Sequence, residues 1–306
     1  MTPSFKDCSL PADLVMHVTS MCGRKGVEWL DDLEKTIDEL ERLWLIEVRQ
    51  PFPAGEFNFV APALRADGEQ TVVKISPPFE TVEIVGEADY LRSRNGNGAV
   101  KLIVEDMTRR AILIERAVPG DNLTEVFKDD EAGAVDPAIE VLRSILLLEP
   151  PDMRGIIKLE NWFDGLRRHE STDFPSDYAA KALSIYDNLS GRPDRTFYLH
   201  GDFHPANIVS ATRSPFLAID PKGIVGDIGY EIAVFLNNFH WWQETKTDIR
   251  PRLERAIAQF SDAFDLDSFE LRQWAFAQMV LGAWWTFDEM PEIYSGEVAR
   301  ADIWDV

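Results

Sequence analysis

Residues 197–208 read FYLHGDFHPANI, and residues 216–223 read FLAIDPKG. The first stretch places an Asn at position 207 after an Asp at position 202, and the second ends a short apolar run at Asp220. Phosphoryl transfer needs this combination, because one carboxylate can accept or orient the proton of an acceptor while an amide oxygen and a second carboxylate bind Mg²⁺. We therefore predict a phosphoryl-transfer site around Asp202, Asn207 and Asp220.

The segments around these stretches predict a mainly helical region. Residues 196–199 and 216–219 are short apolar runs, which indicate strands on either side of the polar loop. Residues 269–287 are apolar nearly all round, which predicts a buried helix. Further helices are predicted after Gly229 and over residues 136–148, 157–169 and 176–189, the last starting at a Ser cap.

The first part of the chain is richer in strand patterns. Amphipathic spacing predicts one helix over residues 27–44 and a second over residues 80–94. Strands are predicted over residues 45–48, 57–60, 71–75, 100–105 and 111–116. Strands first and helices later are typical of an α+β protein. We expect two lobes, residues 1–117 and 118–306, joined by a short hinge near Ala117.

Composition favours a soluble intracellular protein. The chain has 306 residues and is 45% hydrophobic, which is enough for a substantial core. Cys8 and Cys22 cannot form a disulfide framework, so a reducing compartment is expected. The N-terminal stretch has no secretory pattern, and no apolar run approaches the roughly 18–20 residues of a membrane span. We expect a cytoplasmic protein without a membrane partner.

The charge of the chain restricts its partners. The formal net charge is −22, from 53 acidic and 31 basic residues. Such a field repels phosphate backbones and therefore argues against nucleic acid as a partner. It could attract a cationic small molecule, or it could serve solubility alone. Because ATP is an anion, an ATP site in this chain needs local positive charge or Mg²⁺.

The motifs also resemble those of a known superfamily. HGDFHPAN matches the H-x-D-x-x-x-x-N catalytic loop of protein kinases, and Asp220 stands where their metal-binding Asp stands. The HGD-hydrophobic-HPxN form is similar to aminoglycoside phosphotransferases and choline kinases. Residues 219–231, IDPKGIVGDIGYE, resemble the streptomycin 6-phosphotransferase/hydroxyurea phosphotransferase family, and the likeness spans residues 43–287. It implies a bilobal protein-kinase-like fold.

The resemblance also implies roles for individual residues. Asp202 would be the catalytic base, and Asn207 and Asp220 would bind Mg²⁺. Lys74 would contact the α- and β-phosphates of ATP, paired with Glu87 of the following helix. Glu83, one helical turn away, is the reserve partner. The adenine would hydrogen-bond to a hinge made of Glu115, Arg116 and Ala117.

Three departures from the superfamily pattern stand out. Residues 51–57 lack the G-x-G-x-x-G of protein kinases, so a short loop with Gly55 would cover the phosphates. DPKG replaces DFG, so the inactive-state switching of protein kinases is not expected. Glu231 stands where many antibiotic kinases have Asp.

The acceptor site is harder to predict. In this fold it lies between the catalytic loop and the C-terminal helices, where Trp241, Trp242, Trp285, Asp288 and Glu289 could line it. Aromatic rings and carboxylates suit a guanidinium or ammonium group. The alternative is that the tryptophans belong to the core and the acids to a solvated helix end.

Other polar side chains near the site have their own alternatives. We expect His200 and His204 to pack the catalytic loop and not to act as bases. Lys222 could touch phosphate or only balance the charge of Asp220.

The sequence thus predicts a small-molecule kinase that uses ATP and Mg²⁺. Streptomycin at its 6-hydroxyl is the first acceptor to consider, and hydroxyurea the second. A metabolite kinase for choline, a sugar or an amine is an alternative within the same fold. A nucleotide-binding pseudokinase is a further alternative, against which the intact Lys74, Asp202, Asn207 and Asp220 argue.

Overall fold

The computed structural model describes residues 4–53, 57–79, 83–128, 130–146, 157–168, 173–242, 249–291, 294 and 296–306. The contacts divide the chain into two compact units, Met1–Gly120 and Asp121–Val306. The boundary predicted from the sequence falls after Ala117, slightly before the observed boundary after Gly120. Gly55, expected to cover the phosphates, lies outside the described residues.

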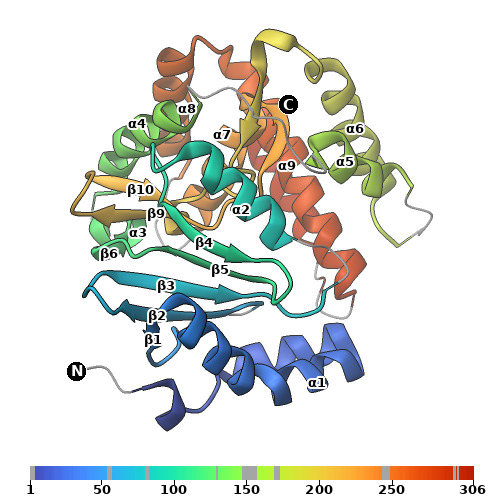
Figure 1. Cartoon of the computed structure of the whole chain (residues 1–306). Coiled ribbons are helices and arrows are strands. Elements are labelled where there is room, and N and C mark those ends of the chain that lie inside the picture. The colour runs from blue at the N-terminus through green and yellow to red at the C-terminus, as the bar shows by residue number, and fades with distance from the viewer. Residues whose placement is uncertain are drawn as a thin grey trace. The chain divides into compact units, whose positions relative to one another are not determined.

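The first unit is built on a five-stranded antiparallel sheet (Figure 1). Its order is β1 (Ile46–Val48), β2 (Phe59–Arg65), β3 (Gln70–Ile75), β5 (Ala111–Glu115) and β4 (Leu102–Asp106). In the register of the sheet, Lys74 of β3 lies between Val60 of β2 and Ile112 of β5. Lys74 therefore stands on the central strand, where the backbone is bonded on both sides.

One face of this sheet packs on α1 (Ala12–Trp44), which follows the short 3₁₀ helix η1 (Phe5–Asp7). The shared core includes Leu14, Val18, Leu33, Ile37 and Leu40 of α1 and Phe59, Ala61, Val73 and Ile75 of the sheet. The helix begins well before residue 27, so the predicted start is wrong. Gly23 interrupts it with φ 52° and ψ −131°.

Alternation along β3 directs Lys74 to the opposite face from Val73 and Ile75. The second helix, α2 (Glu83–Arg94), contacts β4 and β5. Its buried residues include Ile84, Glu87 and Leu91. Part of the helix that the sequence predicts from residue 80 lies outside the described residues.

The second unit is mainly helical. Its helices are α3 (Leu123–Val126), α4 (Val135–Leu146), α5 (Leu159–Arg167), α6 (Ser176–Leu189), α7 (Ile228–Trp242), α8 (Arg250–Phe264) and α9 (Ser268–Glu289), with 3₁₀ helices η2 (Glu131–Ala134), η3 (Pro193–Arg195), η4 (Pro205–Asn207) and η5 (Glu297–Trp304). Helix α9 contacts α5, α6, α7, α8 and η5, and its Trp274 is fully buried. The predicted buried helix is therefore the centre of this unit, although Phe269 in its first turn is 53% exposed.

Two small sheets carry the loops between the helices. One has the order β10 (Phe216–Ala218), β9 (Ile208–Ala211), β6 (Pro119–Asn122), and the other β7 (Ile157–Lys158), β11 (Ile224–Asp227), β8 (Thr196–Leu199). Strands β6, β7, β9 and β11 were not predicted from the sequence. The helix predicted from residue 157 starts at Leu159, because the two residues before it pair with β11. The predicted Ser cap of α6 is also wrong, since Pro175 occupies the N-cap position.

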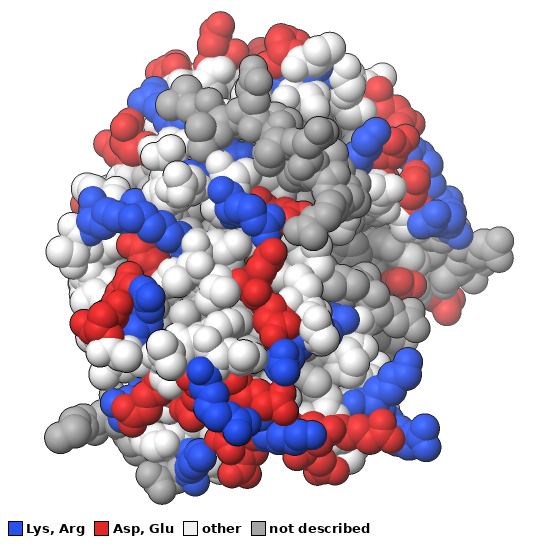
Figure 2. Space-filling view, in the orientation of Figure 1, with Lys and Arg blue, Asp and Glu red and all other residues white. Residues whose placement is uncertain are grey.

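The surface carries charges of both signs. On the face drawn in Figure 2, lysines and arginines are interspersed with acidic side chains, and the described residues form no continuous basic stripe there. Within the described part of the chain, no helix combines the length and the hydrophobicity of a membrane span.

Candidate active site

One side chain of α7 binds the backbone of the loop that carries Asp202. The carboxylate of Glu231 accepts the backbone N–H of His200 at 2.6 Å and that of Gly201 at 2.9 Å. Glu231 is fully buried, so these bonds offset part of the cost of burying its charge. Glu231 therefore does bind the catalytic loop, although it is one methylene longer than the Asp of many antibiotic kinases.

Inside this loop Asp202 and Asn207 are in direct contact. The Asn207 Nδ2 group donates to the backbone oxygen of Asp202 at 3.0 Å and to its Oδ2 at 3.3 Å. With the amide nitrogen so engaged, Oδ1 is the atom that Asn207 can offer to a metal. The Asp202 side chain is 32% exposed, and His204 Nε2 lies 3.6 Å from its Oδ1. The carboxylate is thus oriented but still accessible.

His200 links the loop to the strand end that carries Asp220. Its Nδ1 accepts the backbone N–H of Asp202 at 3.3 Å, so its Nε2 carries the proton and donates to the Ile219 carbonyl at 2.9 Å. Burial lowers the pKa of His200 to about 3, although the Asp220 carboxylate acts in the opposite direction. His200 is therefore a neutral packing residue in this geometry.

Asp220 follows β10 with an unusual backbone. Its φ is 58°, in the left-handed region that Asp adopts more readily than most residues. The N–H of Ile219 bonds to the carbonyl of Asn207 at 2.9 Å, which ties the two predicted metal ligands together through the main chain. Lys222 Nζ lies 3.8 Å from Asp220 Oδ2, close enough to balance its charge.

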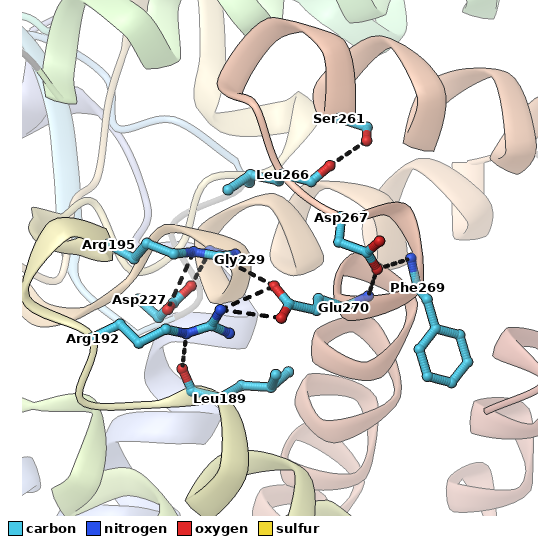
Figure 3. Close-up of polar contacts among 10 residues, drawn as sticks. All are labelled: Leu189, Arg192, Arg195, Asp227, Gly229, Ser261, Leu266, Asp267, Phe269 and Glu270. Carbon is cyan, nitrogen blue, oxygen red and sulfur yellow. Dashed lines mark hydrogen bonds and ion pairs between the residues drawn. The ribbon is translucent and has the colours of Figure 1, made fainter.

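A cluster of four charged side chains positions the start of α7 (Figure 3). Asp227 accepts the N–H of Gly229 at 2.7 Å and lies 3.7 Å from Arg195 Nε. Arg195 and Arg192 both bind Glu270 of α9, at 2.5 and 3.1 Å. Burial raises the pKa of Asp227, and this effect outweighs the hydrogen bond from the Gly229 N–H and the charge of Arg195, which both lower it. For Glu270 burial would raise the pKa, but the hydrogen bonds from the two arginines outweigh it and lower the pKa.

Close packing between α7 and α9 also fixes the start of α7. A Cβ on Gly229 would lie 2.2 Å from Cδ1 of Trp274, so only a glycine lets α7 approach α9 at this point. Since Glu231 follows two residues later in the same helix, these contacts determine where its carboxylate meets the catalytic loop.

The residues predicted to lie near the phosphates belong to the first unit. Lys74 Nζ and Glu87 Oε2 form an ion pair at 2.7 Å, with side-chain exposures of 9% and 4%. Glu83, the reserve partner, is exposed. The structure thus brings Lys74 and Glu87 together within this unit, while their convergence with Asp202, Asn207 and Asp220 stays a prediction.

Strand β5 ends at Glu115, the first of the three predicted hinge residues. The N–H of Glu115 bonds to the Lys101 carbonyl at 2.8 Å, and its carboxylate accepts the Lys101 N–H at 3.0 Å. The N–H of Arg116 bonds to the Gln70 carbonyl at 3.4 Å. Ala117 follows directly after these two residues, so the end of the sheet orients its backbone.

Among the predicted acceptor residues, Trp285 of α9 is partly exposed and Asp288 is exposed. Trp241, Trp242 and Glu289 belong to α7 and α9, but their side chains lie outside the described residues. Sequence reasoning missed Trp162 of α5, whose ring centroid lies 5.3 Å from that of Trp285. A lone tryptophan in a predicted amphipathic helix gives no signal of this contact.

The family model described as aminoglycoside/hydroxyurea antibiotic resistance kinase matches residues 43–289. A streptomycin 6-kinase of Streptomyces griseus is 28% identical over 96% of this chain and 96% of its own. A hydroxyurea phosphotransferase of Kitasatospora aureofaciens is 27% identical over 95% and 82%. The amicoumacin kinase hAmiN, solved with AMP-PNP, Ca²⁺ and Ami, has a TM-score of 0.62 at 16% identity, over 90% of this chain and 96% of that one.

Fold and catalytic loop together define a protein-kinase-like phosphotransferase of the α+β class. Since the family match covers most of the sequence, the chain belongs to the aminoglycoside/hydroxyurea antibiotic resistance kinase family. The predicted fold class and family are confirmed.

Proposed function

We propose that this protein transfers the γ-phosphate of ATP to a hydroxyl of an aminoglycoside-type acceptor, with streptomycin at its 6-hydroxyl as the first substrate and hydroxyurea as the second. The observation that carries the proposal is the loop in which Asn207 orients Asp202 while Glu231 binds the two residues before it. The names of the relatives support the choice of acceptor.

In this mechanism Asp202 accepts the proton of the acceptor hydroxyl as its oxygen attacks the γ-phosphorus in line. The hydrogen bond from Asn207 to Oδ2 orients the Asp202 carboxylate for this step. The bond from phosphorus to the β–γ bridging oxygen breaks, and the electron pair leaves with ADP. Positioning and charge neutralisation supply most of the rate enhancement in this chemistry.

Asn207 Oδ1 and the Asp220 carboxylate are hard oxygen donors that fit Mg²⁺. The described residues contain no group of three or more His, Cys, Asp or Glu side chains that could hold a metal, so the remaining ligands would be phosphate oxygens and water. Bound there, the ion would neutralise charge on the phosphates.

Lys74, held by Glu87, would contact the α- and β-phosphates. For adenine, the N–H groups of Glu115 and Arg116 are already bonded within the sheet. A backbone donor from the hinge would therefore come from Ala117, and the proposal places the N–H···adenine bond there.

A panel of acceptors tests this function, with ADP release as the measurement. Streptomycin should stimulate turnover well above the rate without acceptor. Asp202→Asn should lower kcat by about 10²- to 10⁴-fold while the affinity for ATP stays within a few fold. Asp194→Asn, an exposed Asp of η3, is the matched control and should behave as wild type.

The alternatives give different results in the same assay. No stimulation by streptomycin together with strong turnover of choline, a sugar or an amine would favour the metabolite kinase. ATP binding without turnover of any acceptor would favour the pseudokinase. Unchanged turnover in Asp202→Asn would remove Asp202 as the base.

A further inference from the structure

An indole ring lies against the residue that precedes Asp202. Gly201 has φ +83°, and a Cβ at this position would lie 3.3 Å from Cη2 of Trp162 in α5. Its other close neighbours would be Ile224 and Lys222, each at 3.2 Å. Trp162 therefore packs directly on the backbone of the catalytic loop at Gly201, one residue before Asp202.

Two further rings extend this contact across the unit. The ring centroids of Trp162 and Tyr230 are 5.9 Å apart at 58°, and those of Trp162 and Trp285 are 5.3 Å apart at 89°. The three rings come from α5, α7 and α9, and we call them the aromatic wall. Tyr230 is fully buried, whereas Trp162 and Trp285 keep part of their surface exposed. The buried ring supports two indoles that a ligand can touch.

Asp202 follows directly after Gly201, the residue on which Trp162 packs. The pKa of Tyr230 is raised well above its usual value, first by burial and next by the charge of the Asp202 carboxylate. That carboxylate is thus within electrostatic reach of the phenol that contacts Trp162. An acceptor whose hydroxyl is bonded to Asp202 would therefore bind one residue along the loop from the contact between Gly201 and Trp162.

We infer that Trp162, together with Trp285, binds the cationic group of the acceptor and so determines that this kinase prefers guanidinium- or ammonium-bearing alcohols. The inference rests on the proposed function and deepens it. Indoles attract cations more strongly than other aromatic side chains do, through the negative face of the ring. The formal net charge of −22 favours the approach of the same class of molecule.

The test compares Trp162→Leu, Trp162→Phe and a matched control, Phe269→Leu, which replaces a 53% exposed aromatic residue of α9. In Trp162→Leu the KM for streptomycin, which carries guanidinium groups, should rise about 3- to 30-fold. The KM for ATP should rise less than the KM for streptomycin, because the aromatic wall is inferred to contact the acceptor. Trp162→Phe should show a smaller rise, because a phenyl ring keeps part of the attraction, and Phe269→Leu should show none. A thermal unfolding scan of each variant checks that the unit remains folded.

The outcomes separate this inference from the proposed function. An unchanged KM for streptomycin in Trp162→Leu, or an equal rise in the KM for ATP, would overturn the role of Trp162 while leaving the kinase assignment intact. If another cationic alcohol replaces streptomycin as the best substrate, the proposed acceptor is wrong, but the same comparison of KM values decides the role of Trp162. If an uncharged acceptor such as hydroxyurea is preferred over every cationic one, the inference is wrong.

Discussion

The carboxylate of Glu231 lies 2.6 Å from the backbone nitrogen of His200, and its other oxygen lies 2.9 Å from that of Gly201. A side chain at the start of α7 thus holds the two residues that lead into Asp202. Because the contact is to the main chain, it orients the loop whatever side chains the loop carries. The catalytic loop and α7 therefore form one structural element.

Replacing Glu231 by Gln should uncouple these two parts. The amide has a single oxygen acceptor, and its NH₂ group would face an N–H donor, so one of the two bonds is lost. We expect the free energy of unfolding to fall by about 2–3 kcal/mol, as for a hydrogen bond to a charged group. The measurements are urea unfolding and kcat, which should fall with little change in the KM for ATP. Glu28→Gln in α1, at a carboxylate that is 62% exposed, is the control. Equal stability of the two variants would contradict the prediction.

The Lys74–Glu87 pair should show strong energetic coupling. Both side chains are nearly buried, so removing either one breaks a buried ion pair. Glu87→Gln should lower the free energy of unfolding by about 3 kcal/mol, because breaking a buried pair costs more than an exposed one. Lys74→Met should cost a similar amount, and the double variant should cost less than the sum. A double-mutant cycle by urea unfolding measures the difference. Additive costs would show that the two side chains act independently.

Gly229→Ala should destabilise the second unit. The added methyl group would lie 2.2 Å from Cδ1 of Trp274, so the indole or the start of α7 must move. Overpacking of this kind costs about 3 kcal/mol. The control is Gly282→Ala in α9, where a Cβ would meet nothing within 4 Å. That variant should gain about 0.5–1 kcal/mol from helix propensity. Urea unfolding of both variants measures the change in the free energy of unfolding, which should be a decrease for Gly229→Ala and an increase for Gly282→Ala.

Burial of neutral His200 should make stability depend on pH. Its pKa is lowered from 6.5 to about 3, so between these values the unfolded chain binds a proton that the folded chain does not. The contribution is fully present above pH 6.5 and is lost as the pH falls toward 3. From about pH 7 to about pH 5 the loss should be about 2 kcal/mol. Unfolding of wild type and His200→Gln in metal-free buffer measures it. The variant should show a shallower pH dependence, and equal slopes would exclude His200 as its source.

Local signals predicted much of the fold. Strand β8 (Thr196–Leu199) and helix α6 (Ser176–Leu189) have the predicted bounds, because turn residues and a change of hydrophobic period mark their ends. Strand β11 was missed, because Ile224–Asp227 is short and contains a glycine. Its pairing with β8 and β7 depends on partners remote in sequence. Tertiary contacts therefore decide this strand.

The same distinction applies to the site. The spacing of Asp202, Asn207 and Asp220 is visible in the sequence because the loop geometry is local. Trp162 was missed because its contact with Gly201 depends on how α5 packs against the catalytic loop. The N-terminal part of α1 was missed because Gly23 breaks the helical period.

The left-handed backbone at Asp220 limits which substitutions report cleanly on its carboxylate. At φ 58° asparagine is tolerated nearly as well as aspartate, whereas alanine lacks the local side-chain hydrogen bonds that favour these two residues in the left-handed region. Asp220→Asn therefore removes the carboxylate and preserves the turn, so its phenotype reports on the side chain and not on the backbone. An alanine scan would combine charge loss with distortion of the loop and would overstate the part that the charge plays.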